Sequence, residues 1–90
     1  MEEKFIAAWE RNRAEAEKLG VRMRATDVKN AKRTLSGSRL SDGFNLLAQK
    51  GRLDLSLEAL GVDKQFTALF TDDEANEALM RLLEAGYRFK

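Results

Sequence analysis

The sequence of 90 residues contains no histidine, no cysteine and no proline. Without imidazole or thiolate, a chain lacks the commonest general base near neutral pH, the usual zinc, copper and iron ligands, and the strongest nucleophile. These absences exclude most familiar active sites, so we predict no catalytic residue, no metal ligand and no cofactor. The absence of cysteine also means that disulfides contribute nothing to stability.

Long apolar runs are missing as well. No stretch approaches the roughly 18 apolar residues that a membrane span requires. Residues 1–20 show no positively charged segment followed by an apolar run, which is the pattern of a secretory signal. We therefore expect a cytoplasmic location and no membrane contact.

Hydrophobic residues make up 43% of the chain and charged residues 34%, which is enough apolar material for a core and too much for a disordered tail. The length suits one domain over residues 1–90. A domain of this size buries only about 60% of its unfolded surface, so its stability is modest unless a second copy helps. A homodimer is therefore left open.

Apolar spacing and capping residues predict two helices in the first half of the chain. A stripe including Phe5 and Trp9 predicts a helix over 2–19, which ends at Gly20. Alternation over 21–25 favours a short extended segment. A second, strongly basic helix over 28–35 is capped by Asp27, and small residues at 36–38 then form a turn.

The second half predicts further short helices. One covers 39–50, in which Gly43 indicates close packing or a later start. Another covers 57–60 and is capped by Asp54 or Ser56, with a brief strand at 53–57 as the alternative. One or two further helical turns follow over 64–70. Thr71 caps a last helix that begins at Asp72 and ends before Gly86, with an apolar face made by Ala75, Ala78, Leu79, Leu82 and Leu83. The fold class is all-α, a compact single-domain bundle of about five or six short helices.

Two clusters have a chemical and a structural interpretation. Asp72, Asp73 and Glu74 offer oxygen ligands for a hard cation, but they lack the spacing of a calcium loop and fit a helix cap much better. The turn at 36–38 lies beside basic residues and could hold a phosphate on backbone amides, but it has no Walker pattern. A plain turn between helices is the better interpretation.

The distribution of charge is more informative than the net charge of +1. Residues 21–40 carry six basic side chains against Asp27 alone, a local charge of +5, so the rest of the chain carries −4. The basic residues are Arg22, Arg24, Lys29, Lys32, Arg33 and Arg39. Such segregation suits docking on an acidic protein surface or on phosphates. The alternative is a solvated helix face paired with acids elsewhere in the fold.

Nucleic-acid binding has weaker support than protein binding. The pI of about 8.0 is low for a dedicated nucleic-acid-binding domain, and the aromatic residues do not alternate with the basic ones. Residues 56–70 have a helix-glycine-helix rhythm, but Lys64 is the only positive charge on the second helix.

Three aromatic residues are candidates for a partner contact. Trp9 lies at helical spacing from other apolar residues, which favours a position in the core over a position at an interface. Tyr87 and Phe89 follow the last helix, so they either anchor a partner or cover the bundle.

We therefore predict a small non-enzymatic helical module that binds another macromolecule, most simply a protein, through the basic residues named above with Tyr87 and Phe89. The alternative is a DNA-binding regulatory protein that contacts phosphates through segment 22–39. A carboxylate-dependent enzyme is the third hypothesis, and it would require a large cleft with two converging acids.

Overall fold

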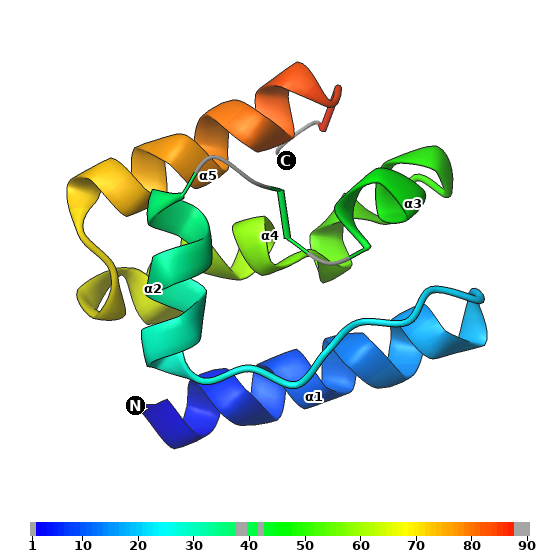
Figure 1. The fold of residues 1–90 in the computed structure, drawn as a ribbon, viewed down its shortest axis with the longest axis horizontal. Helices are drawn as coiled ribbons and strands as arrows, with labels where there is room; N and C mark the ends of the chain where they lie inside the picture. Colours follow the sequence, from blue (N-terminus) through cyan, green and yellow to red (C-terminus); the bar gives the residue numbers. More distant parts are fainter. Residues whose placement is uncertain (1, 38–39, 42, 88–90) are drawn as a thin grey trace.

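The computed structural model describes residues 2–37, 40–41 and 43–87, and these residues form α-helices and short 3₁₀ helices without a strand (Figure 1). In chain order the elements are α1 (Glu2–Lys18), α2 (Val28–Ser36), α3 (Phe44–Gln49), the 3₁₀ helix η1 (Leu53–Leu55), α4 (Leu57–Gly61), the 3₁₀ helix η2 (Lys64–Leu69) and α5 (Asp72–Glu84). The prediction of an all-α bundle is confirmed. Within the described residues, no helix is long and apolar enough to cross a membrane.

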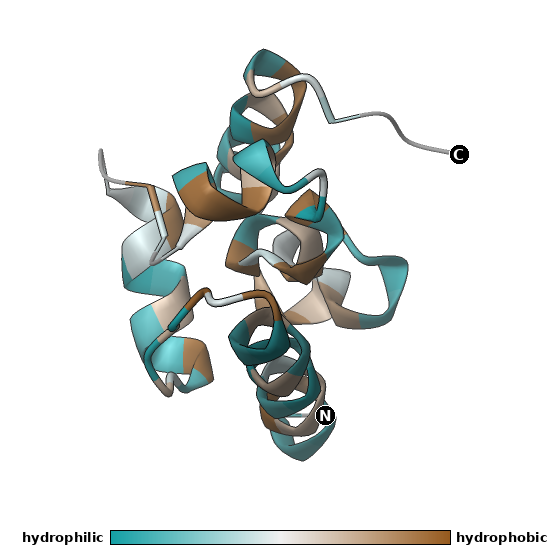
Figure 2. Ribbon diagram, turned by 90° about the vertical axis from the view of Figure 1, so that its right-hand side faces the viewer, coloured by the Kyte–Doolittle hydropathy of each residue, from teal (hydrophilic) through white to brown (hydrophobic). Residues whose placement is uncertain are grey.

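The helices surround one core. In Figure 1, α1 and α5 lie on opposite sides of the molecule, and α4 lies between them in contact with α1, α2 and α5. Apolar segments concentrate where the helices face one another (Figure 2). The largest fully buried apolar side chains are Phe5, Phe66, Leu35, Leu47 and Leu82.

The chain reverses after α1 and returns along it as an extended segment. The amide of Val21 donates to the carbonyl of Ala16, and that of Gly20 donates to Glu17, a bonding pattern that closes a helix end. The predicted alternation is confirmed at Val21 and Met23, which are buried, but not at Ala25, which is exposed. Among the described residues, no strand pairs with this segment. Side chains of α1 donate hydrogen bonds to some of its carbonyls instead.

The predicted N-terminal caps of α2 and α5 are confirmed. The carboxylate of Asp27 accepts from the amide of Asn30 at 2.8 Å, and α2 begins at Val28. The hydroxyl of Thr71 accepts from the amide of Glu74, whose carboxylate accepts in turn from the amide of Thr71. This reciprocal cap satisfies two amides that the helix itself leaves unpaired.

The predicted start of the third helix is wrong. α3 begins at Phe44 rather than at residue 39, and Gly43 precedes it with a φ of 76°, a conformation that side chains disfavour. A Cβ added at Gly43 would lie 2.8 Å from Cγ1 of Val21. Both expectations raised by this glycine, close packing and a later start, are therefore confirmed.

The centre of the fold is the short helix α4. Of the two caps that the sequence offered, Ser56 is the one used: its hydroxyl accepts from the amide of Ala59 at 3.1 Å. Residues 53–55 form η1 instead of the alternative strand.

The predicted apolar face of α5 is partly wrong. Ala78 and Leu82 are buried as expected, but Leu83 is 55% exposed. The helix is rotated so that Glu74 and Arg81 are buried instead. The reason for this rotation is a buried partner for Arg81, which is described below.

Candidate functional site

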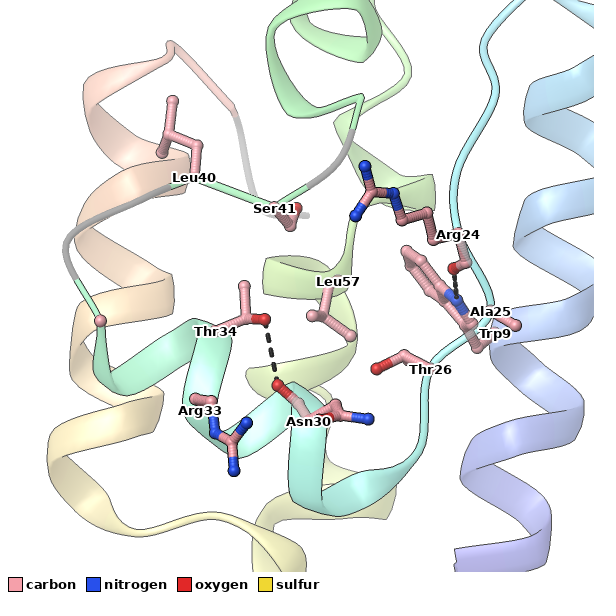
Figure 3. Close-up of a pocket in the computed structure, with 11 residues that line it drawn as sticks. Trp9, Arg24, Ala25, Thr26, Asn30, Arg33, Thr34, Leu40, Ser41 and Leu57 are labelled. Atoms are coloured by element: carbon pink, nitrogen blue, oxygen red, sulfur yellow. Dashed lines mark hydrogen bonds between the residues drawn. The ribbon is translucent and has the colours of Figure 1, made fainter.

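A groove of about 600 Å³ lies between the extended segment after α1, the outer face of α2 and the start of α4 (Figure 3). Its polar lining includes Arg24, Thr26, Asn30, Arg33 and Thr34, and its apolar lining includes Trp9, Leu40 and Leu57. No acidic side chain belongs to the lining among the residues that the structure describes. Its volume lies within the range of ligand-binding pockets, and its charge suits an anionic group.

Trp9 forms part of the wall of the groove. The side chain is only 2% exposed, so the prediction of a core position is confirmed. Its indole Nε1 donates to the carbonyl of Arg24 at 2.8 Å, and Nε of Arg13 donates to the carbonyl of Met23 at 2.8 Å. These two bonds hold the extended segment against α1, and they place Arg24 at the groove.

The polar side of the groove comes from one face of α2. Asn30, Arg33 and Thr34 are three and four residues apart, a spacing that places them together on the helix surface. Arg33 is exposed, and no carboxylate of the described residues forms an ion pair with it. Its guanidinium therefore offers its donors to a bound group.

The wall that includes Thr34, Gly37 and Ser41 is held by a buried ion pair. Nη1 of Arg81 lies 3.2 Å from Oε2 of Glu58, and both side chains are buried. Arg81 also donates to the carbonyls of Thr34 and Gly37, the latter at 2.7 Å, while Glu58 accepts from the amide and hydroxyl of Ser41. We call Glu58, Arg81 and Ser41 the latch.

The latch makes the groove a preformed feature. Two residues of the lining, Thr34 and Gly37, accept hydrogen bonds from the latch, and a third, Ser41, belongs to it. No buried side-chain nitrogen or oxygen atom lacks a hydrogen-bond partner in the described part of the chain. A fully satisfied buried network of this kind fixes one arrangement of the backbone around it.

The latch was not predicted from the sequence. The only signal was the spacing of Glu74, Ala78 and Arg81, which places two charged residues on the same face of α5 as its buried apolar residues. A charged residue on a buried stripe indicates a buried partner. The partner itself, Glu58, lies 23 residues away from Arg81, so no local pattern identifies it.

Lys32, one of the predicted contact residues, is engaged elsewhere. Its Nζ lies 2.9 Å from Oε1 of Glu74, donates to the carbonyl of Leu69 and lies 5.9 Å from the ring centre of Phe70. Burial opposes ionisation of Glu74, but hydrogen bonds from Lys32 and Thr71 outweigh burial and lower the pKa of this carboxyl. Lys32 thus joins α2 to the start of α5.

The other predicted contact residues do not gather on one surface. Arg22 lines a separate hollow with Glu10 and Glu17 of α1, and Lys29 is exposed on α2. Tyr87 is half-buried and packs against the core. Arg39 and Phe89 lie outside the described residues. Of the members of the predicted set that the structure describes, Arg24 and Arg33 are the two that line the same groove.

The two sequence clusters with alternative interpretations have structural roles in the described residues. The acids at 72–74 occupy the first turn of α5, where Glu74 completes the cap. Ser36 is the last residue of α2, and its hydroxyl donates to the carbonyl of Lys32 at 2.7 Å. Ser38 lies outside the described part of the chain.

Comparisons of the chain with protein-family models, with curated proteins and with solved structures found no match. Function therefore rests on the geometry and chemistry of the groove.

Proposed function

We propose that the protein is a small non-enzymatic binding module that engages another protein through the groove and the adjoining basic face of α2. The observation that carries this proposal is that Arg33, which is exposed and has no ion pair with a described residue, lines the groove beside the partly exposed Leu40. Complementary charge of this kind favours an acidic partner and speeds its association.

The arrangement of the charges favours a protein over a nucleic acid. Phosphate-backbone binding needs several cations on one face. Here Lys32 is paired with Glu74, and Arg22 shares its hollow with two acids of α1. The groove also exposes apolar lining, including Leu40, which is 42% exposed. Apolar centres with a charged rim are typical of protein interfaces.

A capture experiment tests this proposal. The immobilised protein is exposed to lysate with and without nuclease, and bound proteins are identified by mass spectrometry. The variant Lys29→Glu with Arg33→Glu reverses two exposed cations on α2. Its matched control is Lys4→Glu with Arg11→Glu, which makes the same change of charge at exposed positions on α1.

We expect a protein partner that is retained by the wild type and by the α1 control, survives nuclease and is lost with the α2 variant. The same capture by both variants would reject the basic face of α2 as the binding surface. Loss of all capture after nuclease would favour the DNA-binding alternative, as would steep weakening of binding with salt.

A further inference from the structure

We infer that the groove takes a short acidic segment of a partner protein, with one carboxylate held by Arg33 and a neighbouring aliphatic side chain placed against Leu40 and Leu57. This inference rests on the proposed function and names the chemistry of the partner. It is carried by the juxtaposition of polar donors from α2 with apolar lining from α1, α4 and residue 40.

The carboxylate position follows from the donors on α2. Arg33 presents a planar guanidinium that matches a carboxylate with two parallel hydrogen bonds. Asn30 stands one turn earlier on the same face, and its side-chain amide adds further donors. Figure 3 shows both side chains extending from α2, with the Asn30 amide and the Arg33 guanidinium pointing in different directions. No described acidic residue of the lining competes for them.

The aliphatic position follows from the opposite lining. Trp9 and Leu57 are almost completely buried, yet both contribute to the wall of the groove. Leu40 remains 42% exposed beside them. An aliphatic side chain of the partner would cover this leucine and remove further apolar surface from water.

The latch favours tight binding because it fixes the wall in advance. The carbonyls of Thr34 and Gly37 are held by Arg81, and the amide of Ser41 is held by Glu58. A partner segment therefore does not have to order this part of the groove when it binds. Arg81 is in this sense a positioning residue.

A titration with defined peptides tests the inference. The probe is an end-blocked hexapeptide of alternating leucine and glutamate, and the control peptide has glutamine in place of glutamate. Trp9 is the only tryptophan of the chain and lines the groove, so its fluorescence and its indole N–H resonance report occupation of the site. The protein variants are Arg33→Glu and its matched control Arg11→Glu.

We expect the glutamate peptide to bind at least about tenfold more tightly than the glutamine peptide, and Arg33→Glu to weaken it by at least about tenfold. Arg11→Glu should change the affinity by less than about threefold. Circular dichroism of each variant confirms that the helices persist. Equal binding of both peptides, or equal binding by wild type and Arg33→Glu, would overturn the inference.

Two further outcomes separate this inference from the proposed function. If the α2 variant loses its captured protein but the glutamate peptide does not bind the wild type, the inference fails and the proposed function stands. If a thymidine oligonucleotide displaces the peptide and itself binds more tightly through Arg33, the groove is a nucleic-acid site, and both are overturned.

Discussion

Glu58 and Arg81 form an ion pair, with 3.2 Å between Oε2 and Nη1, in which neither side chain is more than 5% exposed. Removing one partner of such a pair leaves a buried charge without compensation, which costs about 3–5 kcal/mol. We therefore predict that Arg81→Met lowers the free energy of unfolding by about that amount in urea denaturation. In the double variant Glu58→Leu with Arg81→Met, part of the loss should be recovered, because no unpaired buried charge remains, although Thr34, Gly37 and Ser41 lose their hydrogen-bond partners.

The exposed pair of Arg52 and Asp54 supplies the control for this prediction. Its atoms approach to 3.1 Å, similar to the buried pair, but both side chains are in contact with water. Arg52→Met should have no measurable effect on unfolding, because exposed pairs are screened by solvent. An equal loss for Arg52→Met and Arg81→Met would mean that the burial of the latch contributes nothing.

Glu74 gives the protein a specific sensitivity to acid. Its pKa is lower in the folded state than in the unfolded chain, so the folded state favours the ionised carboxylate. This contribution to stability is present above the ordinary glutamate pKa, about 4.3, and is lost as the pH falls through the lowered value. We predict that Glu74→Gln flattens the acid side of the stability curve, as measured by thermal unfolding between about pH 3 and pH 7.

Lys32 is the partner whose removal tests the cause. Lys32→Met removes a hydrogen bond and a charge from Glu74, so the pKa of this carboxyl should rise, as followed by NMR titration. A glutamate pKa that does not respond would place the cause in the Thr71 cap alone.

Gly43 combines a left-handed backbone with close packing, whereas Gly51 has only the first. Their φ angles are 76° and 70°, but an added Cβ would meet Val21 and Met23 only at Gly43. Backbone strain costs about 1–2 kcal/mol at either position. We predict that Gly43→Ala destabilises by roughly 1–3 kcal/mol more than Gly51→Ala in urea denaturation, because of overpacking. Equal losses would show that Val21 and Met23 yield without cost.

Leu40 and Leu46 are similarly exposed, but only Leu40 lines the groove. We predict that Leu40→Ala lowers the affinity for the leucine-glutamate peptide by about five- to tenfold, because the peptide no longer covers a leucine. Leu46→Ala should leave the affinity unchanged. Both variants should retain stability to within about 0.5 kcal/mol, as substitutions at exposed positions usually do.

Features set by neighbouring residues could be predicted from the sequence, and those set by distant ones could not. The caps at Asp27 and Thr71 were predicted because each is completed by a residue only three positions later. The rotation of α5 was not predicted, because it depends on Glu58 in another helix. The late start of α3 accompanies the packing of Gly43 against Val21, which lies 22 residues earlier in the chain.

The candidate site follows the same division. Composition singled out the basic segment, but the sequence could not show which of its residues line the groove and which face other parts of the fold. Lys32 points to α5, whereas Arg33, its neighbour in the chain, lines the groove, because successive residues face different directions on a helix. The groove itself depends on contacts between α1, α2 and α4 that have no local signature.

An exchange of charge between protein and peptide tests the central claim most directly. The affinities of the leucine-glutamate peptide and of a leucine-lysine peptide are measured by calorimetry for the wild type and for Arg33→Glu. We predict that Arg33→Glu lowers the affinity for the glutamate peptide and raises the affinity for the lysine peptide, because opposite charges would then face each other across the groove. Unchanged preference for the glutamate peptide in Arg33→Glu would contradict the assignment of this groove as the place where an acidic partner binds.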